Sequence, residues 1–523
     1  MDYLAAVSSG FQIAFEWNNL LFCFIGVALG TIVGLLPGIG ALSTISMLLP
    51  LTFYMDPTAA IIMLAGVFYG AQYGGSIASI LLNIPGTSTN AVTCLDGYPI
   101  AKSGRAGVAL TITTLSSFIG GSFAILVLML IGPLLAEVAL VFGAPEYTAI
   151  MIFGLIAAST LSDGSMVKGL SMVVLGVLLG CVGLDPNSGA PRMQMGMTEL
   201  SDGISIVVIA MGLFGVAEIL LNLMKNAGTP FTLHDVTLRS LMPTKTDLKE
   251  ATMPTVRGTL LGSALGILPG TGATIASFMA YALEKRVSKT PEIFGKGAIA
   301  GIASPEASNN AAVQTAFIPT LSLGIPGDAV MSVMLGALMI HGIAPGPGLV
   351  REHPDLFWGL IASFWIGNVL LLILNLPFVG VFVRILRIPY DALYIGMLFF
   401  ICVDVFSINN SVFDVFMVIL FGIAGLVMLL LNFPAAPLLL GFILGPMIEE
   451  YARRALLLSR GSFEVFVSTP ISAIFMGLSL AMLLGLALMP LVRKMLRNRR
   501  ASEVDAAKAS AEEMHAQGRH EGA

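Results

Sequence analysis

The chain contains one twelve-residue segment twice. Residues 30–41 read Gly-Thr-Ile-Val-Gly-Leu-Leu-Pro-Gly-Ile-Gly-Ala, and residues 262–273 read Gly-Ser-Ala-Leu-Gly-Ile-Leu-Pro-Gly-Thr-Gly-Ala. Seven of the twelve positions are identical at an offset of 232. This match predicts an internal duplication.

Each copy places glycines four residues apart and then Pro-Gly-x-Gly inside an apolar run. Glycines at this spacing clear one helix face, so that another backbone can approach closely. The Pro and Gly residues that follow interrupt the helix, because Pro removes an amide donor and Gly permits non-helical dihedral angles. Such breaks are also common as simple packing kinks. Two breaks at matching places in two halves, however, favour a transporter's binding site.

Composition places the chain in a membrane. Of 523 residues, 56% are hydrophobic and 11% are charged, whereas about 25% are charged in an average soluble domain. We therefore predict an all-α polytopic membrane protein with about 12 transmembrane helices in two internal repeats, for which the broken helices favour an inverted arrangement. The four cysteines are scattered singly, so neither a disulfide framework nor a zinc site is expected.

The predicted organisation has four parts. Residues 1–225 form the first membrane repeat and residues 258–495 the second, because Leu-Asn-Ile-Pro-Gly (82–86) is matched by Leu-Gly-Ile-Pro-Gly (323–327) at an offset of 241. Residues 226–257 form a polar linker and residues 496–523 a charged tail, both expected in the cytoplasm from their basic residues.

One apolar run is too long for a single crossing. Residues 106–142 would make a helix about 55 Å long, against a hydrocarbon core of about 30 Å. We expect this segment to bend or to cross twice, with the break at Gly120 and Gly121.

Two carboxylates next to the matched motifs are candidate cation-coupling groups. Glu306 precedes a pair of asparagines, and Asp328 directly follows the second Ile-Pro-Gly. A charge at bilayer depth costs about 3 kcal/mol on insertion scales, so such groups normally face a cavity, a cation or a partner. The alternative is that both residues lie in interfacial loops, where charge costs little.

Neutral polar residues near the breaks are candidate substrate ligands. Amide and hydroxyl donors, together with helix N-terminal amides, can bind a carboxylate without a buried cation. The basic pair Lys102 and Arg105 is more typical of a helix flank that sets topology. The predicted substrate contacts are Pro37, Gly38, Gly40, Ser76, Asn83, Gly86, Thr87, Ser88, Pro269, Gly270, Thr271, Gly272, Asn309, Asn310, Pro326 and Gly327.

An enzyme is disfavoured. The zinc-protease pattern His-Glu-x-x-His is absent, and Gly-Gly-Ser-Ile (74–77) lacks the final glycine of a rhomboid-like motif. We expect no cofactor other than a coupling ion, sodium or a proton, with sodium bound at the carbonyl groups of the Pro-Gly motifs. No nucleic-acid partner is expected.

Several segments together resemble the TctA family, the large membrane subunit of the tripartite tricarboxylate transporters. They are Gly-Leu-Leu-Pro-Gly-Ile-Gly-Ala (34–41), Tyr-Gly-Gly-Ser-Ile (73–77), Leu-Leu-Asn-Ile-Pro-Gly (81–86), Asp-Gly-Tyr-Pro-Ile-Ala-Lys (96–102), Ser-Asn-Asn-Ala-Ala (308–312) and Leu-Gly-Ile-Pro-Gly-Asp (323–328). The resemblance spans both halves of the chain.

This resemblance implies a secondary transporter of the bacterial inner membrane. The partners it implies are a small TctB-type membrane subunit and a periplasmic TctC-type solute-binding protein that delivers a carboxylate such as citrate. Uptake would be driven by a sodium or proton gradient. A passive pore for small organic anions is the alternative from another functional class.

Overall fold

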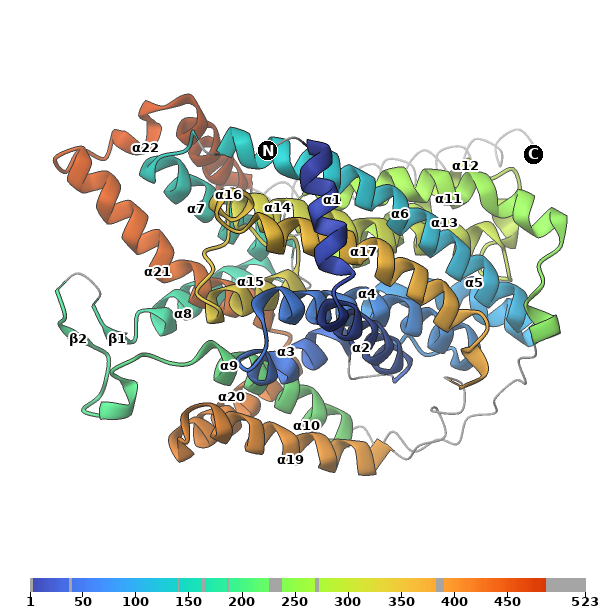
Figure 1. Cartoon of the computed structure of the whole chain (residues 1–523), viewed down its shortest axis with the longest axis horizontal. Coiled ribbons are helices and arrows are strands. Elements are labelled where there is room, and N and C mark those ends of the chain that lie inside the picture. Colours follow the sequence, from blue (N-terminus) through green and yellow to red (C-terminus); the bar gives the residue numbers. More distant parts are fainter. Residues whose placement is uncertain are drawn as a thin grey trace, which may run out of the picture.

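The computed structural model describes residues 3–36, 40–139, 141–161, 165–185, 188–224, 238–268, 272–381 and 390–485 (Figure 1). In these residues the chain is almost entirely helical, with one pair of two-residue antiparallel strands, β1 (Gly183–Leu184) and β2 (Pro191–Arg192). Seven of the described helices are long and apolar enough to cross a membrane, and shorter apolar helices accompany them. The chain is therefore an all-α membrane protein, and the total of about 12 crossings stays a prediction.

The N-terminal half, up to residue 224, contains α1 (Tyr3–Ala14), α2 (Trp17–Leu35), α3 (Gly40–Thr52), α4 (Pro57–Leu82), α5 (Thr93–Ile100), α6 (Ala106–Ala139), α7 (Ala144–Leu161), α8 (Met166–Gly180), α9 (Ile206–Ala210) and α10 (Ala217–Met224). The C-terminal half, from residue 238, contains α11 (Lys245–Gly266), α12 (Gly272–Val287), α13 (Ala300–Thr315), α14 (Phe317–Leu323), α15 (Ala329–Ile340), α16 (Gly348–Glu352), α17 (Pro354–Asn375), α19 (Tyr390–Asn409), α20 (Val412–Leu430), α21 (Ala435–Leu458) and α22 (Val465–Ser468). Short 3-10 turns cover Ser88–Asn90, Thr198–Leu200, Leu238–Leu241 and Pro291–Ile293, and π-helical segments cover Ala101–Arg105 and Met211–Val216.

The glycines before the first break bring two backbones into contact. A Cβ atom added to Gly30 would overlap the carbonyl oxygen of Val67, and one added to Gly34 would overlap that of Ala71. Residue numbers increase in the same direction along the two helices, so α2 and α4 run parallel. Only glycine allows this approach, because any side chain would force the helices apart.

The glycines before the second break make the same contacts. A Cβ atom added to Gly262 would overlap the carbonyl oxygen of Ser308, and one added to Gly266 would overlap that of Ala312. Helices α11 and α13 are therefore also parallel. The glycines lie 232 positions after their counterparts and the carbonyl groups 241 positions after theirs, the two offsets of the sequence motifs.

Helix α4 runs parallel to α17. A Cβ atom on Gly359 would lie 3.4 Å from the side chain of Thr58, and the hydroxyl of Tyr73 donates a 2.9 Å hydrogen bond to Asn368. Residue numbers rise together in the two helices. Helix α6 runs the opposite way to α17, because Gly121 lies beside Asn368 whereas Gly132 lies beside Phe357.

Helices α13 and α14 run in the direction of α6. The Ser117 hydroxyl lies 3.4 Å from the Glu306 carboxylate, and further along the Ser322 hydroxyl donates to the carbonyl oxygen of Gly132 at 3.0 Å. Since α6 is antiparallel to α17 and α4 is parallel to it, α13 and α4 point in opposite directions. The two glycine-contact pairs therefore run antiparallel to each other.

Helices α11 and α12 form a helical hairpin whose turn contains the second Pro-Gly motif. Near its open end, Arg257 pairs with Glu284, with a 2.9 Å hydrogen bond from Nε to the carboxylate. The chain re-enters a helix at Gly272, whose φ of +60° is a left-handed value that glycine adopts without strain. The break thus reverses the chain instead of merely bending a helix.

The predicted break at Gly120 and Gly121 is wrong. Helix α6 continues through both residues, and the irregular segment lies before it, at Ala101–Arg105, where Gly104 has a φ of +85°. Gly120 instead accommodates the backbone of Ala307, whose carbonyl oxygen an added Cβ would overlap. Glycine here serves close packing, which an apolar run alone does not distinguish from a bend.

The polar connection between the halves is partly helical. Residues 225–237 lie outside the described part, but α11 begins at Lys245, within the range expected to be a linker. Thr244 and Asp247 cap this helix reciprocally, and Asp247 also pairs with Arg105 at 2.6 Å. The charged tail, residues 496–523, lies outside the described residues.

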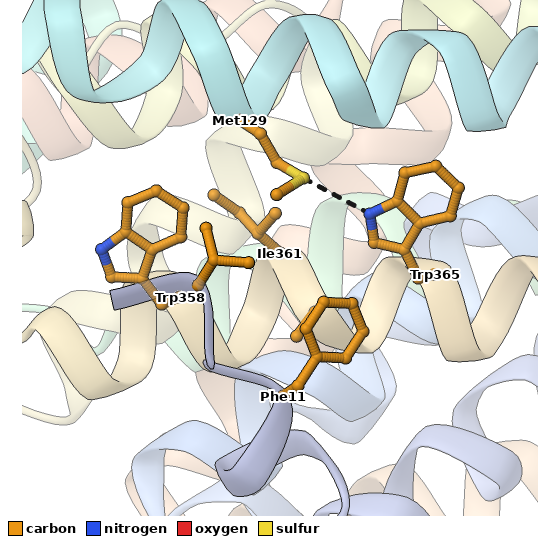
Figure 2. A pocket seen from close by; sticks show the side chains of 7 residues that line it. Phe11, Met129, Trp358, Ile361 and Trp365 are labelled. Atoms are coloured by element: carbon orange, nitrogen blue, oxygen red, sulfur yellow. Dashed lines mark hydrogen bonds between the residues drawn. The ribbon is translucent and has the colours of Figure 1, made fainter. Parts of the chain in front are cut away.

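Helix α1 lies across α17 and α6 through apolar and aromatic side chains (Figure 2). Phe11, Trp358 and Trp365 line a narrow gap, and the Trp365 indole nitrogen lies 3.4 Å from the sulfur of Met129. The Tyr3 hydroxyl of α1 donates a 3.2 Å hydrogen bond to the carbonyl oxygen of Met129 in α6. Together with the apolar contacts, it fixes α1 on the outside of the helix bundle.

Candidate functional site

The two Pro-Gly turns themselves are not described. Pro37, Gly38, Pro269, Gly270 and Thr271, and with them the sodium site expected at their carbonyl groups, lie outside the described residues. The residues that follow each turn, Gly40 and Gly272, both have a positive φ, +68° and +60°, and begin α3 and α12. The residues around the start of α3 and the start of α12 therefore describe the surroundings of the two turns.

Two other loops, the one after α4 with Ile-Pro-Gly at 84–86 and the one before α15 with Ile-Pro-Gly at 325–327, both approach the start of α12. Ser88, in the loop after α4, shares a 3.0 Å hydrogen bond with the Thr274 hydroxyl in the first turn of α12. From the other loop, Asp328 approaches so that its Cβ would be 3.6 Å from a Cβ atom at Gly272. Ser88, Gly272 and Asp328, predicted as site residues from distant parts of the sequence, thus lie around one helix N-terminus. That N-terminus offers amides that no intrahelical acceptor satisfies.

The loop after α4 is bound to α4 by neutral side chains. Thr89 donates a 2.5 Å hydrogen bond to Gln72, Thr87 donates one of 2.5 Å to the side chain of Asn90, and Ser79 donates to the Asn90 carbonyl oxygen at 3.0 Å. Thr87 is thereby engaged within the loop, whereas Ser88 is exposed.

Three further predicted contacts have local structural roles. Asn83 ends α4 with a φ of +57°, and Gly86 lies so close to Gly34 that an added Cβ would overlap its carbonyl oxygen. Ser76 donates a 2.8 Å hydrogen bond to the Tyr73 carbonyl oxygen within its own helix. These residues shape the loop and its support.

The loop before α15, which contains the Ile-Pro-Gly motif at 325–327, is buried at its centre. Pro326 and Gly327 are buried, and an added Cβ at Gly327 would come within 2.9 Å of the Ala316 side chain. The Asp328 carboxylate accepts a 2.9 Å hydrogen bond from the amide of Met331, so it caps the N-terminus of α15. One role of this carboxylate is therefore structural.

Glu306 lies in the middle of α13 and is 1% exposed. Its Oε1 atom accepts hydrogen bonds from Asn90 at 3.0 Å and from Thr93 at 2.5 Å, and Ser117 lies 3.4 Å from Oε2. All three partners are neutral and come from the N-terminal half. Among the ion pairs of the described residues, none involves Glu306. A buried carboxylate with neutral donors alone can take up a proton or a cation, because no fixed positive charge compensates it.

The two neighbouring asparagines differ in what they bind. Asn310 donates a 3.1 Å hydrogen bond to the Glu306 carbonyl oxygen, within its own helix. Asn309 is 1% exposed, and neither its amide nitrogen nor its amide oxygen has a hydrogen-bond partner in the described part of the chain. It follows Glu306 by three positions and so lies on the same side of α13. An unpaired buried amide is costly, so Asn309 is a candidate ligand residue.

Asp96 is a buried carboxylate whose role the sequence did not reveal. Its Oδ1 atom accepts hydrogen bonds from the amides of Gly295, Gly297 and Ala298 at 2.8–2.9 Å, and its Oδ2 atom accepts one from Tyr281 at 2.9 Å. The residue thereby joins α5 to the loop between the α11–α12 hairpin and α13. Its position in a Gly-Tyr-Pro motif was the available signal, but the partners lie about 200 positions away.

No cluster of three or more His, Cys, Asp or Glu side chains suited to a metal ion occurs among the residues described here. A cation would therefore have carboxylate, hydroxyl, amide or carbonyl oxygens as ligands, the set that hard cations prefer.

Comparison with known proteins identifies the family of this chain. The profile of the family described as "Tripartite tricarboxylate transporter TctA family" matches residues 20–440. An Agrobacterium vitis protein, "Uncharacterized 52.8 kDa protein in TAR-I ttuC' 3'region", is 49% identical over 493 residues, which cover 94% of this chain and 98% of that protein. A second from the same organism, "Uncharacterized protein in TAR-II ttuC' 3'region", is 52% identical over 232 residues, 44% of this chain and 96% of its own length. No solved structure matches. With a match over residues 20–440 that includes both glycine-contact pairs, the chain belongs to the tripartite tricarboxylate transporter TctA family.

Proposed function

We propose that this chain is the translocating subunit of a secondary transporter that takes up a tricarboxylate or related carboxylate, citrate-like in chemistry, across the bacterial inner membrane. A cation gradient drives uptake, and a periplasmic binding protein delivers the substrate. The observation that carries the proposal is the meeting of two loops, one from each half, at the start of α12.

The two halves are inverted repeats. The glycine-contact pairs α2–α4 and α11–α13 support this, because they repeat at offsets of 232 and 241 and point in opposite directions. Broken elements at matching positions of inverted repeats line the substrate site in several transporter folds. The helices that precede the two turns, α2 and α11, then enter the membrane from opposite sides.

The substrate carboxylate binds to neutral donors. Support comes from Asn309, which has no hydrogen-bond partner among the described residues, and from the hydroxyls of Ser88 and Thr274 beside the α12 N-terminus. Helix N-termini favour anions through free amides and the helix dipole. Thr271, next to this terminus, is a further proposed contact.

Glu306 and Asp328 are the proposed cation-coupling groups, for sodium or a proton. Glu306 has the stronger support, since its partners are neutral and it contacts the N-terminal half. Asp328 lies next to the second Pro-Gly turn, whose carbonyl groups complete the proposed cation site.

The orientation follows from basic residues at one end of the molecule. The end formed by α5, the open end of the α11–α12 hairpin and the loop to α13 carries Lys102, Arg105, Lys245, Lys249, Arg257, Lys285, Arg286, Lys289 and Lys296 (Figure 1). Fewer basic residues, among them Arg192, Arg453, Arg454 and Arg460, lie at the opposite end, and the end richer in basic residues is expected on the cytoplasmic side. The opposite end then faces the periplasm and the binding protein, and a small TctB-type subunit completes the complex.

The test is uptake by the three proteins reconstituted in liposomes, with sodium and proton gradients imposed separately. We expect saturable uptake that requires both a gradient and the binding protein. Flux that stays linear in substrate and continues without a gradient would establish the passive pore instead. Full uptake by this chain alone would contradict the dependence on partners.

A further inference from the structure

The segment between α8 and α9 carries three exposed methionines. It projects beyond the helices with β1 and β2, at the end of the molecule opposite α5 (Figure 1). Within residues 193–197, called here the methionine loop, Met193, Met195 and Met197 are 46%, 85% and 38% exposed. Methionine is adaptable and polarisable, and it is over-used on surfaces that bind other proteins.

The backbone presents these side chains at a cost. Met193 and Met195 have φ values of 49° and 50°, and this left-handed conformation is unfavourable for residues that carry a side chain. Strained, exposed positions of this kind cluster where a surface serves binding.

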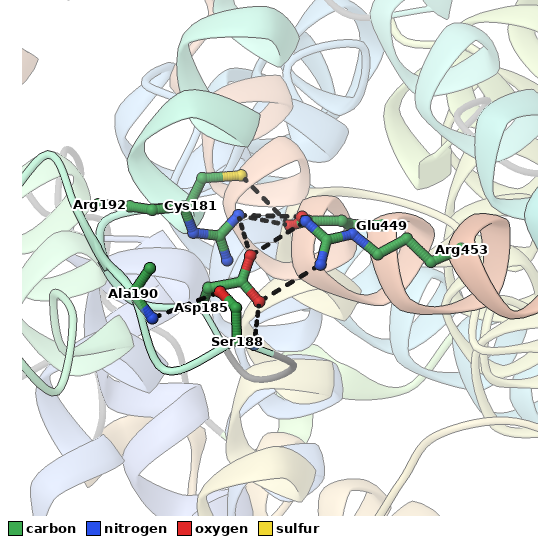
Figure 3. A network of polar contacts seen from close by, with 7 residues as sticks. All are labelled: Cys181, Asp185, Ser188, Ala190, Arg192, Glu449 and Arg453. Carbon is green, nitrogen blue, oxygen red and sulfur yellow. Dashed lines mark hydrogen bonds and ion pairs between the residues drawn. The ribbon is translucent and has the colours of Figure 1, made fainter.

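Four charged side chains fix the base of the loop (Figure 3). Arg192, immediately before the loop, pairs with Glu449 at 2.9 Å and with Asp185 at 3.8 Å. Arg453 pairs with Asp185 at 3.0 Å and also with Glu449. The network ties β1 and β2 to the end of α21, so the methionines project from a braced support. A preorganised loop loses less freedom on binding.

In the proposed orientation the loop lies on the outer side, and two exposed acidic side chains follow it in the sequence. It lies opposite the basic end, and between β1 and α9 the exposed side chains Glu199 and Asp202 follow it. We propose that the methionine loop is the docking element for the periplasmic carboxylate-binding protein, which meets it with an apolar patch bordered by basic side chains. This inference rests on the proposed function.

A site-specific cross-link tests the contact directly. A photo-reactive amino acid replaces Met195 in the full chain, which is reconstituted with its small subunit and given the purified binding protein of the same system. We expect a cross-link to that protein that weakens as salt is raised, because charges at an exposed rim are screened. The matched control replaces Met242, which is 78% exposed near the basic end and should not cross-link. Cross-links to lipid alone, or equal yields at the two positions, would overturn the proposal.

A kinetic measurement separates docking from transport. The triple variant Met193→Ser, Met195→Ser, Met197→Ser should raise the half-saturating concentration of binding protein at least tenfold while leaving the maximal uptake rate near that of the unmodified chain. Met242→Ser should change neither. If the unmodified chain requires the binding protein and the triple variant matches it in both quantities, the docking inference fails and the proposed function stands. If the unmodified chain transports without the binding protein, the proposed function fails, whatever the cross-link shows.

Discussion

Ser88 and Thr274, 186 positions apart, share a hydrogen bond of 3.0 Å between their hydroxyl groups. One belongs to the loop after α4 and the other to the first turn of α12, so the contact joins the two halves at the second Pro-Gly turn. Only two hydroxyls are involved, which makes it a weak link, worth about 0.5–1.5 kcal/mol. A contact of this strength can open and close during a transport cycle.

Glu306→Gln should alter the cation dependence of uptake while the protein still folds. Glutamine keeps an oxygen that can accept from Asn90 and Thr93, but it removes the charge that a cation or proton neutralises. Glu306→Ala leaves buried donors unpaired, at about 1–3 kcal/mol each, and should reduce the yield of folded protein. Uptake at varied sodium and pH, with size-exclusion chromatography of both variants, checks this. Unchanged cation dependence in Glu306→Gln would remove this residue from the coupling role.

Asp328 should show separable effects on stability and coupling. Asparagine caps helices about as well as aspartate, so Asp328→Asn should retain the stability of α15 and shift the cation dependence of uptake. Asp328→Ala should in addition lose about 1 kcal/mol of stability. Thermal unfolding of the solubilised protein and uptake assays give the two readouts. If Asp328→Asn and Glu306→Gln both transport with normal cation dependence, coupling must depend on backbone carbonyl groups alone.

Asn309→Ala should raise the half-saturating substrate concentration about tenfold, corresponding to about 1.4 kcal/mol of lost binding. The reason is that its amide has no hydrogen-bond partner in the part of the chain that the structure describes, so we expect it to bind the substrate. Asn310→Ala is the matched control, since the Asn310 amide is hydrogen-bonded within its own helix and should matter less. Concentration series of uptake with both variants make the comparison. Equal effects of the two substitutions would argue against a ligand role for Asn309.

Gly262→Ala should destabilise the protein by about 1–3 kcal/mol, because the new methyl group overlaps the Ser308 carbonyl oxygen and must separate α11 from α13. Gly477→Ala serves as the control, since nothing lies within 4 Å of its added Cβ. The melting temperature of the purified protein distinguishes the two. A melting temperature for Gly262→Ala equal to that of the control would show that the backbone contact is not required.

The pairing of Asp247 with Arg105 should contribute stability that depends on pH. Burial raises the pKa of the Asp247 carboxyl, but hydrogen bonds from Arg105 and Thr244 outweigh burial and hold the pKa below its ordinary 3.8. A carboxyl whose pKa is lowered by folding stabilises the protein above its unfolded pKa of about 3.9 and loses that contribution as the pH falls through the folded value. The melting-temperature difference between the unmodified protein and Asp247→Asn should therefore shrink between pH 6 and pH 3. A difference independent of pH would contradict this. The exposed Glu250→Gln is the control.

The duplicated glycine pattern could be predicted from the sequence because close backbone contact requires glycines at a regular spacing within one short segment. Gly30 and Gly34 allow the backbone of α4 to approach α2. Gly262 and Gly266, 232 positions later, allow the backbone of α13 to approach α11 in the same way. The carboxylates Glu306 and Asp328 were likewise conspicuous, as charges in apolar surroundings. The membrane class followed from such local features, and the candidate site was predicted from them.

The partners of these residues could not be predicted, because they lie far away in the sequence. Glu306 meets Asn90 and Thr93 across more than 200 positions, and Asp96 meets the loop at Gly297 across a similar distance. Gly120 was misjudged because a glycine that admits a neighbouring backbone looks the same as one that allows a bend.

The glycine contacts also determine where the molecule can yield. Helices α2 and α4 touch along their backbones, as do α11 and α13, so neither pair can slide without atoms colliding. We therefore expect each pair to move as one rigid unit, with relative motion at the contacts between the units. For a transport cycle we therefore expect a rocking of preassembled helix pairs, in which α2 keeps its contact with α4 and α11 keeps its contact with α13, while the contacts between the pairs change.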